Sequence, residues 1–112
     1  MPDGFAKTPE PPYYAVIFTS QRKPSDEGYA AMAEKMLALA LEQPGCLGAE
    51  SARGESGLGV TVAYFVDEAS IRAWKQNAQH LDAQRRGKES WYSHYQVRVA
   101  RVERDYSGPD GR

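Results

Sequence analysis

Residues 13–21, Y-Y-A-V-I-F-T-S-Q, constrain the fold more than any other stretch of this chain. The stretch is rich in β-branched and aromatic residues, which is typical of a strand. Both of its alternating sets are apolar, namely Tyr13, Ala15 and Ile17 on one side and Tyr14, Val16 and Phe18 on the other. Such a strand must be covered on both faces. Helices can cover one face, so the other face needs a partner subunit or must enclose a small pocket.

The length of 112 residues fits one domain, which would bury about two-thirds of the unfolded chain's surface. Residues 1–12 hold four prolines and one glycine among polar residues, so we expect a disordered or surface-lying arm. We assign 13–106 to a single domain and 107–112 to a frayed tail.

Charge and cysteine content exclude several classes of partner. The net charge of −1 comes from interspersed acids and bases, so nucleic acid is not an expected partner. Cys46 is the single cysteine, which rules out an intrachain disulfide and fits a reduced cytoplasm. No segment approaches the length of a membrane span, and no basic region followed by an apolar run marks an ordinary export signal. We expect a cytoplasmic protein without a membrane partner.

The remaining elements follow from periodicity and breakers. Ser25 or Asp26 should cap a helix that ends near Gln43, before Pro44 and Gly45. Residues 46–53 and 58–66 read as a hairpin, in which Gly48 and Gly59 predict a bulge or the close approach of another group. Asp67 should cap a second helix that ends near residue 80 or 81, followed by a loop or short helical piece and a strand over 91–103.

This order of strand, helix, strand, strand, helix and strand predicts an α+β fold of the ferredoxin-like type. The expected architecture is an antiparallel four-stranded sheet with two helices on one face. Neither a metal site nor a phosphate-binding loop is expected, because the two histidines lie fourteen residues apart and no glycine-rich loop precedes a helix.

The stretch 70–95 holds both tryptophans and both histidines. On a helix, Ile71, Trp74, Ala78 and Leu81 line one face. Asn77 lies beside Trp74, whereas His80 lies about 120° round, so a pocket that shares both needs a bend in the helix. The alternative is structural: Trp74 belongs to the core, Asn77 caps the helix or faces water, and His80 is a helix-end cation.

Three segments resemble the antibiotic-biosynthesis-monooxygenase-like family: P-G-C-L-G-A-E-S, A-Y-F-V-D-E-A-S-I-R-A-W-K and the closing W-Y-S-H-Y-Q-V-R-V-A-R-V-E-R-D-Y. The resemblance covers about Tyr13 to Tyr106. It implies a homodimer in which two ferredoxin-like subunits pack their open sheet faces into an α+β barrel. This arrangement would supply the layer that the doubly apolar strands require.

The resemblance also implies a choice of functions. In the quinone-forming branch a helix tryptophan, an asparagine one turn earlier and a tyrosine six residues later line the pocket; Trp74 matches, but Ser70 and His80 stand at the other positions. We predict a cofactor-independent monooxygenase that acts on a small aromatic, phenolic or enolic molecule with O2. One alternative is a non-catalytic dimeric barrel that binds a small hydrophobic ligand. Another is a haem-binding or haem-degrading oxygenase.

The chemistry needs a base and an aromatic pocket. A neutral imidazole can remove a phenolic proton near neutral pH, so His80 is the candidate base and His94 the less favoured one. Asn77 or Tyr95 would hold the developing oxyanion. Trp74 and Tyr64 would pack against the substrate's rings. The complete set of expected pocket-lining residues is Trp74, Tyr64, Tyr95, Phe18 and Trp91.

Overall fold

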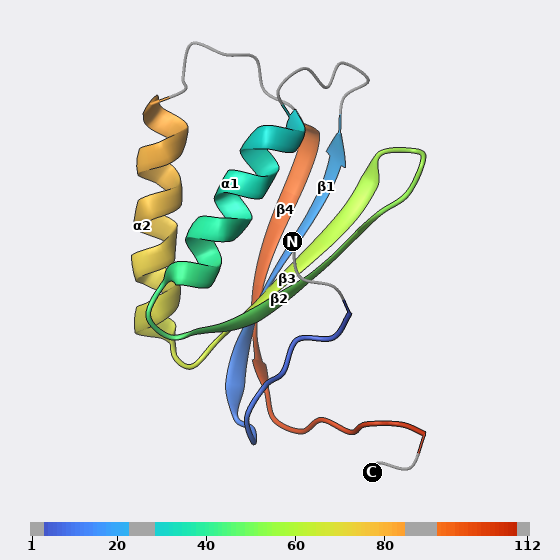
Figure 1. Cartoon of the computed structure of the whole chain (residues 1–112), viewed down its shortest axis with the longest axis vertical. Coiled ribbons are helices and arrows are strands. Elements are labelled where there is room, and N and C mark those ends of the chain that lie inside the picture. Colours follow the sequence, from blue (N-terminus) through green and yellow to red (C-terminus); the bar gives the residue numbers. More distant parts are fainter. Residues whose placement is uncertain (1–3, 23–28, 85–91, 110–112) are drawn as a thin grey trace.

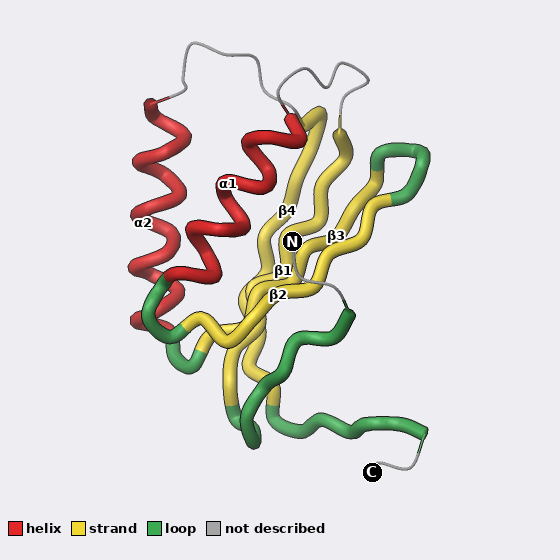
Figure 2. The backbone as a smooth tube through the Cα atoms, viewed as in Figure 1, coloured by secondary structure: helices red, strands yellow, loops and turns green. Residues whose placement is uncertain are grey.

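The computed structural model describes residues 4–22, 29–84 and 92–109, and side chains over 4–22, 36–77 and 94–109. Six elements follow one another along the chain (Figures 1 and 2): β1 (Tyr13–Arg22), α1 (Tyr29–Glu42), β2 (Cys46–Arg53), β3 (Leu58–Phe65), α2 (Glu68–Gln84) and β4 (Tyr92–Val102). The order predicted from the sequence is confirmed, with strand ends that differ by a residue or so.

The four strands form one antiparallel sheet in the order β2-β3-β1-β4. Both helices lie on the same side of this sheet (Figure 1). The ferredoxin-like α+β fold is therefore as predicted. We call the end of the sheet where β1 finishes and β4 begins the upper end, as it is drawn in Figure 1, and the opposite end the lower end.

The strand register assigns each side chain to a face. Val16 of β1 pairs with Ala63 of β3 and with Val99 of β4, and packs against the same core cluster as Trp74 of α2. These positions therefore mark the helix side of the sheet. Because side chains alternate along a strand, the neighbouring positions Ile17, Val62 and Arg98 mark the open side.

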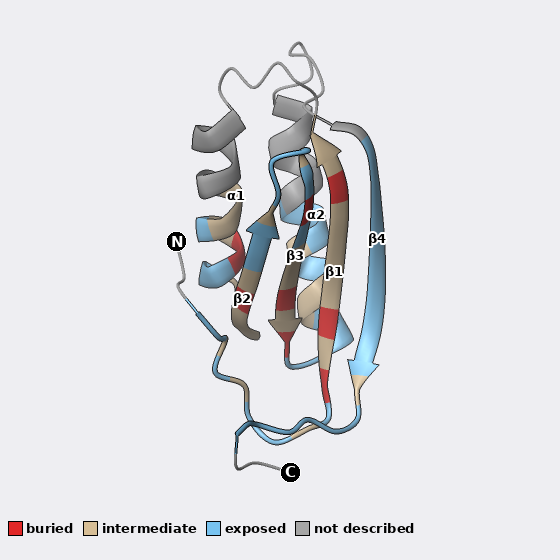
Figure 3. Ribbon diagram, turned by 90° about the vertical axis from the view of Figure 1, so that its right-hand side faces the viewer, coloured by how far each residue is buried: buried red, intermediate tan, exposed pale blue. Residues whose placement is uncertain are grey.

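The core on the helix side is small. Phe65 is fully buried and lies with Ala49 and Ala63 at its centre. Figure 3 shows the buried segments of the strands in red. Five partly buried side chains pack around these three: Val16, Leu37, Cys46, Ile71 and Trp74. The predicted apolar face of α2 is confirmed for Ile71 and Trp74, whereas the side chains of Ala78 and Leu81 lie outside the described ones.

The start of α2 is confirmed and its end is not. Asp67 Oδ1 accepts hydrogen bonds from the Ser70 hydroxyl (2.7 Å) and the Ser70 amide (2.8 Å), which in that order lower the pKa of the Asp67 carboxyl below its usual value. The helix continues to Gln84, so the predicted end at 80 or 81 was wrong. Residues 82–84 contain no breaker, and the first glycine comes only at 87. The predicted caps of α1, Ser25 and Asp26, lie outside the described residues.

Gly45 connects α1 to β2 at a point where no side chain fits. Its φ of 89° lies in the left-handed region, and its carbonyl accepts a hydrogen bond from the Val66 amide at 2.8 Å. A Cβ at this position would lie 2.0 Å from Ser70 Oγ. The start of β2 and the first turn of α2 therefore approach each other as closely as a glycine allows.

We expect Gly45→Ala to lower the free energy of unfolding by more than about 1 kcal/mol, since it adds both backbone strain and overlap with Ser70. Gly54→Ala is the matched control, because a Cβ there meets only the Leu58 carbonyl oxygen at an ordinary 3.9 Å. Urea unfolding of both variants measures the difference. Equal stability of the two variants would contradict this account of Gly45.

Candidate functional site

An apolar strip remains uncovered on the helix side of the sheet. We define the helix-side strip as Phe18 of β1 with Tyr95, Val97 and Val99 of β4. The three β4 side chains are 57%, 50% and 54% exposed, and the Phe18 and Tyr95 rings lie 5.5 Å apart between centroids at 32°. Figure 3 shows why: α2 lies behind β3 and β1, α1 lies on the β2 side of the sheet, and β4 forms an edge without a helix behind it.

A cationic group lies at the upper end of the helix-side strip. Ser20, buried and paired in register with Tyr95, accepts a hydrogen bond from Arg53 Nη2 at 2.6 Å. Arg53 also donates to the backbone carbonyl of Gly57. Its guanidinium lies so close over Gly59 that a Cβ there would be 2.6 Å from it. The prediction that another group closely approaches Gly59 is confirmed. The upper end of the helix-side strip therefore lies beside the positive charge of Arg53.

Trp74 and Asn77, which sequence spacing places side by side on α2, have different surroundings. Trp74 is partly buried and packs against the core of Ala49, Ala63 and Phe65. Asn77 is exposed, and its Nδ2 donates a hydrogen bond to Gln43 Oε1 at 2.9 Å, which ties α2 to the end of α1. The described contacts of both side chains are those of the structural alternative.

The two candidate bases lie on different elements. His80 belongs to the second half of α2, which runs beside the upper part of the sheet (Figure 1), and its side chain lies outside the described ones. Trp91 lies outside the described residues altogether. His94 is exposed and pairs in register with Gln21 on the open side of the sheet. The structure therefore separates His94 from the helix-side strip by the thickness of the sheet.

Tyr64 does not share a pocket with Trp74. Tyr64 lies on the open side, because Ala63 and Phe65 on either side of it belong to the helix-side core. The predicted pair of ring walls, Trp74 and Tyr64, is corrected accordingly: within one subunit the sheet itself lies between them. Phe18 and Tyr95 are the two predicted pocket residues that the structure brings together.

A hydrogen-bonded cluster occupies the lower end of the open side. Tyr64 donates to Glu50 Oε1 (2.7 Å), and Tyr13 donates to Asp105 Oδ2 (2.5 Å). The rings of Tyr13 and Tyr64 meet edge to face, 5.8 Å apart between centroids. The N-terminal arm joins the cluster through the Ala6 amide, which donates to Glu50 Oε2 at 2.9 Å. The cluster therefore links both terminal segments to the sheet.

This cluster raises the pKa of both phenols. Burial is the larger cause for Tyr64, followed by the hydrogen bond to Glu50, and together they raise its pKa to about 12. The pKa of Tyr13 is raised chiefly by its hydrogen bond to Asp105, against an opposing effect of Thr8, whose hydroxyl donates to the Tyr13 oxygen at 3.1 Å. Neither phenol is therefore suited to act as a base at neutral pH.

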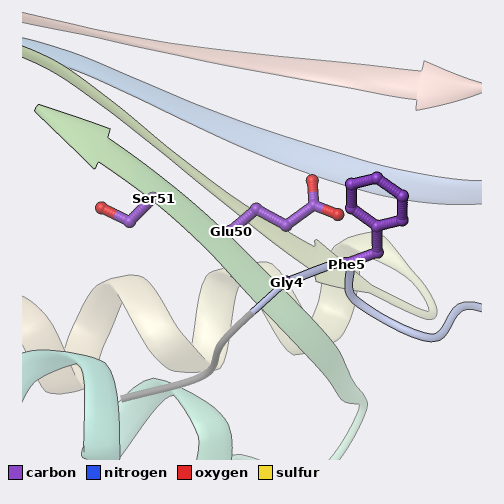
Figure 4. A pocket seen from close by; sticks show the side chains of 4 residues that line it. All are labelled: Gly4, Phe5, Glu50 and Ser51. Carbon is purple, nitrogen blue, oxygen red and sulfur yellow. The ribbon is translucent and has the colours of Figure 1, made fainter.

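Two shallow hollows lie on the open side. One, of about 360 Å³, separates the arm from β2 and is lined by Gly4, Phe5, Glu50 and Ser51 (Figure 4). The other, of about 110 Å³, lies at the upper end; it is lined by Thr19, Ser20, Gln21, Leu58, His94, Gln96 and Arg98. We call the second one the upper hollow.

Metal and thiol chemistry find no support in the described residues. No group of three or more His, Cys, Asp or Glu side chains gathers among them. Burial raises the pKa of the Cys46 thiol, which contacts the core, so this thiol stays protonated at neutral pH. No described helix is long and apolar enough to cross a membrane.

Sequence reasoning missed the polar groups that organise both sides of the sheet. Glu50, Asp105, Ser20 and Arg53 all make cross-strand or tertiary hydrogen bonds. One signal was available: Glu50 stands inside a predicted strand, where a charged residue needs a partner. The identity of that partner depends on strand register, which the sequence does not state.

The fold and the helix-side strip define a class of protein: a small ferredoxin-like domain with an exposed apolar strip beside two aromatic rings. Solved structures share the fold. A protein of Pseudomonas aeruginosa, PA3566, superposes with a TM-score of 0.63 at 20% identity, over 87% of this chain and 98% of that one. A structure described as an antibiotic biosynthesis monooxygenase gives 0.56 at 13% identity, over 86% and 99%.

Sequence comparison supplies the family. The family model of the antibiotic biosynthesis monooxygenases matches residues 12–86, so this chain belongs to that family. The protein YqjZ of Bacillus subtilis (strain 168), described as uncharacterized, is 48% identical over 104 residues, which cover 93% of this chain and 91% of YqjZ. The resemblance seen in the sequence is thereby confirmed.

The raised pKa values predict how stability depends on pH. An unfolded tyrosine ionises near pH 10, whereas folded Tyr64 ionises near pH 12, so the fold resists this ionisation. The stabilisation is complete below about pH 10 and is lost as the pH rises toward 12. We expect Tyr64→Phe to flatten the fall in unfolding free energy over this range, measured by urea unfolding at several pH values. Tyr106→Phe, on the exposed C-terminal segment, is the matched control for the loss of a phenolic hydroxyl.

Proposed function

We propose that this protein is a cofactor-independent monooxygenase for a small aromatic molecule with an acidic phenol or enol. Family membership supports small-molecule chemistry of this kind. The observation that carries the proposal is the helix-side strip, whose apolar side chains stand exposed beside the Phe18 and Tyr95 ring pair. A flat substrate placed there would bury these side chains and stack on the rings.

In the proposed reaction the protein removes a proton and the substrate supplies the electrons. His80 removes a proton from the phenol or enol, and the resulting anion is electron-rich enough to react with O2. When a CH2 group is oxidised to a carbonyl, the substrate supplies all four electrons, and the oxygen atoms leave as the carbonyl and water. No cofactor is needed for this balance. Arg53, at the upper end of the strip, supplies positive charge toward the anion.

The assay is oxygen uptake with a panel of hydroquinones and anthrones. Saturable turnover without added metal or flavin is the expected result. Binding without turnover would favour the alternative, a non-catalytic barrel for a small hydrophobic ligand. That alternative draws on one observation: His94, whose side chain is described, lies on the open side of the sheet and not at the strip. Haem is a third candidate ligand, and a Soret shift on titration with haem would favour a haem-binding protein.

We expect His80→Ala to lower turnover by about 10²-fold or more, the usual contribution of a positioned base. Its free energy of unfolding should change little. Trp74→Ala is the contrasting variant: it should cost about 3 kcal/mol of stability whatever the function, because Trp74 packs against the core. His94→Ala, on the open side, should keep turnover. If His80→Ala retains full activity, His80 is not the base.

We also propose that the protein is a homodimer formed by the open sides of two sheets. Ile17, Val60 and Val62 occupy the middle of this side, and neither helix covers it. The arm and the tyrosine cluster cover the sheet at the lower end, so the uncovered apolar side chains of the sheet itself lie in its middle and at its upper end. Stable interfaces of this type bury more than about 2,000 Å².

The dimer prediction has a matched pair of variants. Val60 on the open side and Leu41 on α1 are almost equally exposed, at 39% and 40%. Val60→Lys should convert the dimer to a monomer, because it would bury unpaired charge in the interface, whereas Leu41→Lys should not. Sedimentation at micromolar concentration measures the change. A wild-type monomer with the circular dichroism of a folded protein would refute the dimer.

A further inference from the structure

Phe5 is an exposed ring on an ordered arm. The ring is 91% exposed, yet the next residue, Ala6, is held by the Glu50 carboxylate, and the arm returns to the sheet through the hydrogen bond from Thr8 to Tyr13. A Cβ on Gly48 would lie only 3.1 Å from Ala6, so the arm packs closely on β2. The backbone that carries Phe5 is thus fixed before any partner arrives, which lowers the entropic cost of docking this ring.

The ring stands on the open side of the sheet. Figure 4 shows the Glu50 side chain extending toward Phe5, while Ser51, the next residue of β2, points the other way. Glu50 lies in register with Val62, a residue of the open side. Phe5 therefore projects from the face that we propose to be the dimer interface, at the corner formed by β2 and the lower end.

The upper hollow lies at the opposite corner of the same face. Leu58, 52% exposed, supplies apolar surface, and the exposed His94 and Arg98 of β4 flank it. Its volume is about 110 Å³. A closed cavity of about 150 Å³ holds a benzene ring, so this open hollow is of the right size for a phenyl group. Arg98 also offers a cation to the face of such a ring.

A two-fold axis can bring these two corners together. If β2 of one copy crosses β4 of the other, the arm corner of each copy faces the hollow corner of its partner, and the contact occurs twice. The charges agree with this arrangement, because the arm corner carries Glu50 and the hollow corner carries Arg98. If β4 of one copy instead stacked on β4 of the other, the Arg98 side chains of the two copies would lie near each other, and like charges would meet.

We propose that Phe5 of each subunit inserts into the upper hollow of its partner, between Leu58 and Arg98, and that Glu50 positions the arm for this contact. The partner is thus a second copy of this chain. The inference rests on the proposed dimer and adds the residue that sets its register. It makes the N-terminal arm a part of the interface.

Photocrosslinking tests the contact directly. Phe5 is replaced by p-benzoylphenylalanine, the variant is mixed with ¹⁵N-labelled wild-type chain, and the irradiated sample is analysed by mass spectrometry. The expected product joins position 5 of the light chain to a heavy peptide that contains Leu58 or residues 94–98. Crosslinks confined to a single chain, in a sample that sediments as a dimer, would overturn the docking of Phe5 while the dimer stands.

The dimer dissociation constant gives a second measurement. Phe5→Ala should raise it about tenfold or more, because two rings leave the interface together, whereas the control Leu41→Ala should change it less than about twofold. Leu58→Ala should weaken the wild-type dimer but add little to Phe5→Ala, since both remove one contact. Fully additive effects would overturn the proposed pairing. A wild-type monomer would instead refute the proposed dimer itself, so the two failures are distinguishable.

Discussion

The rest of this structure depends on the central strands β1 and β3, which carry apolar side chains on both faces of one sheet. The two helices cover the side that holds Val16, Ala63 and Phe65. They leave β4 uncovered on that side and leave the opposite side open. We propose a separate use for each uncovered surface: a flat ligand at the edge beside the helices, and a second copy of the chain on the open side.

The open side is not uniform, because its lower end is polar and hydrogen-bonded within the subunit. Glu50 accepts hydrogen bonds from Tyr64 and from the arm, so a carboxylate that would be costly to bury alone is satisfied within the subunit. Asp105 plays the same part for Tyr13. Because these carboxylates are already hydrogen-bonded within the subunit, they need no partner from a second copy, and the exposed apolar side chains available for association include Leu58, Val60 and Phe5 of the arm.

Much of the fold could be predicted because it follows from local rules. Strand alternation, the cap at Asp67 and the stop at Gly45 each depend on a few neighbouring residues. The end of α2 was misjudged because polar residues alone do not break a helix. The site was harder to predict. Tyr64 lies close to Trp74 in the sequence, but its side chain can face either side of the sheet. A shift of the strand register by one residue would move it to the other side, and no local sequence pattern shows which side the helices cover.

The separation of the two surfaces by a single sheet has a consequence for the chemistry. Phe18 faces the helix-side strip, while its neighbours Ile17 and Thr19 face the open side, so one strand contributes to both. Association of the open sides would restrain β1 and with it the position of the Phe18 ring. Arg53 adds a second link, since it reaches from β2 across Gly59 to Ser20 on β1 and fixes the upper end of the strip. A dimer of this kind would therefore stabilise the ligand surface without contributing a side chain to it.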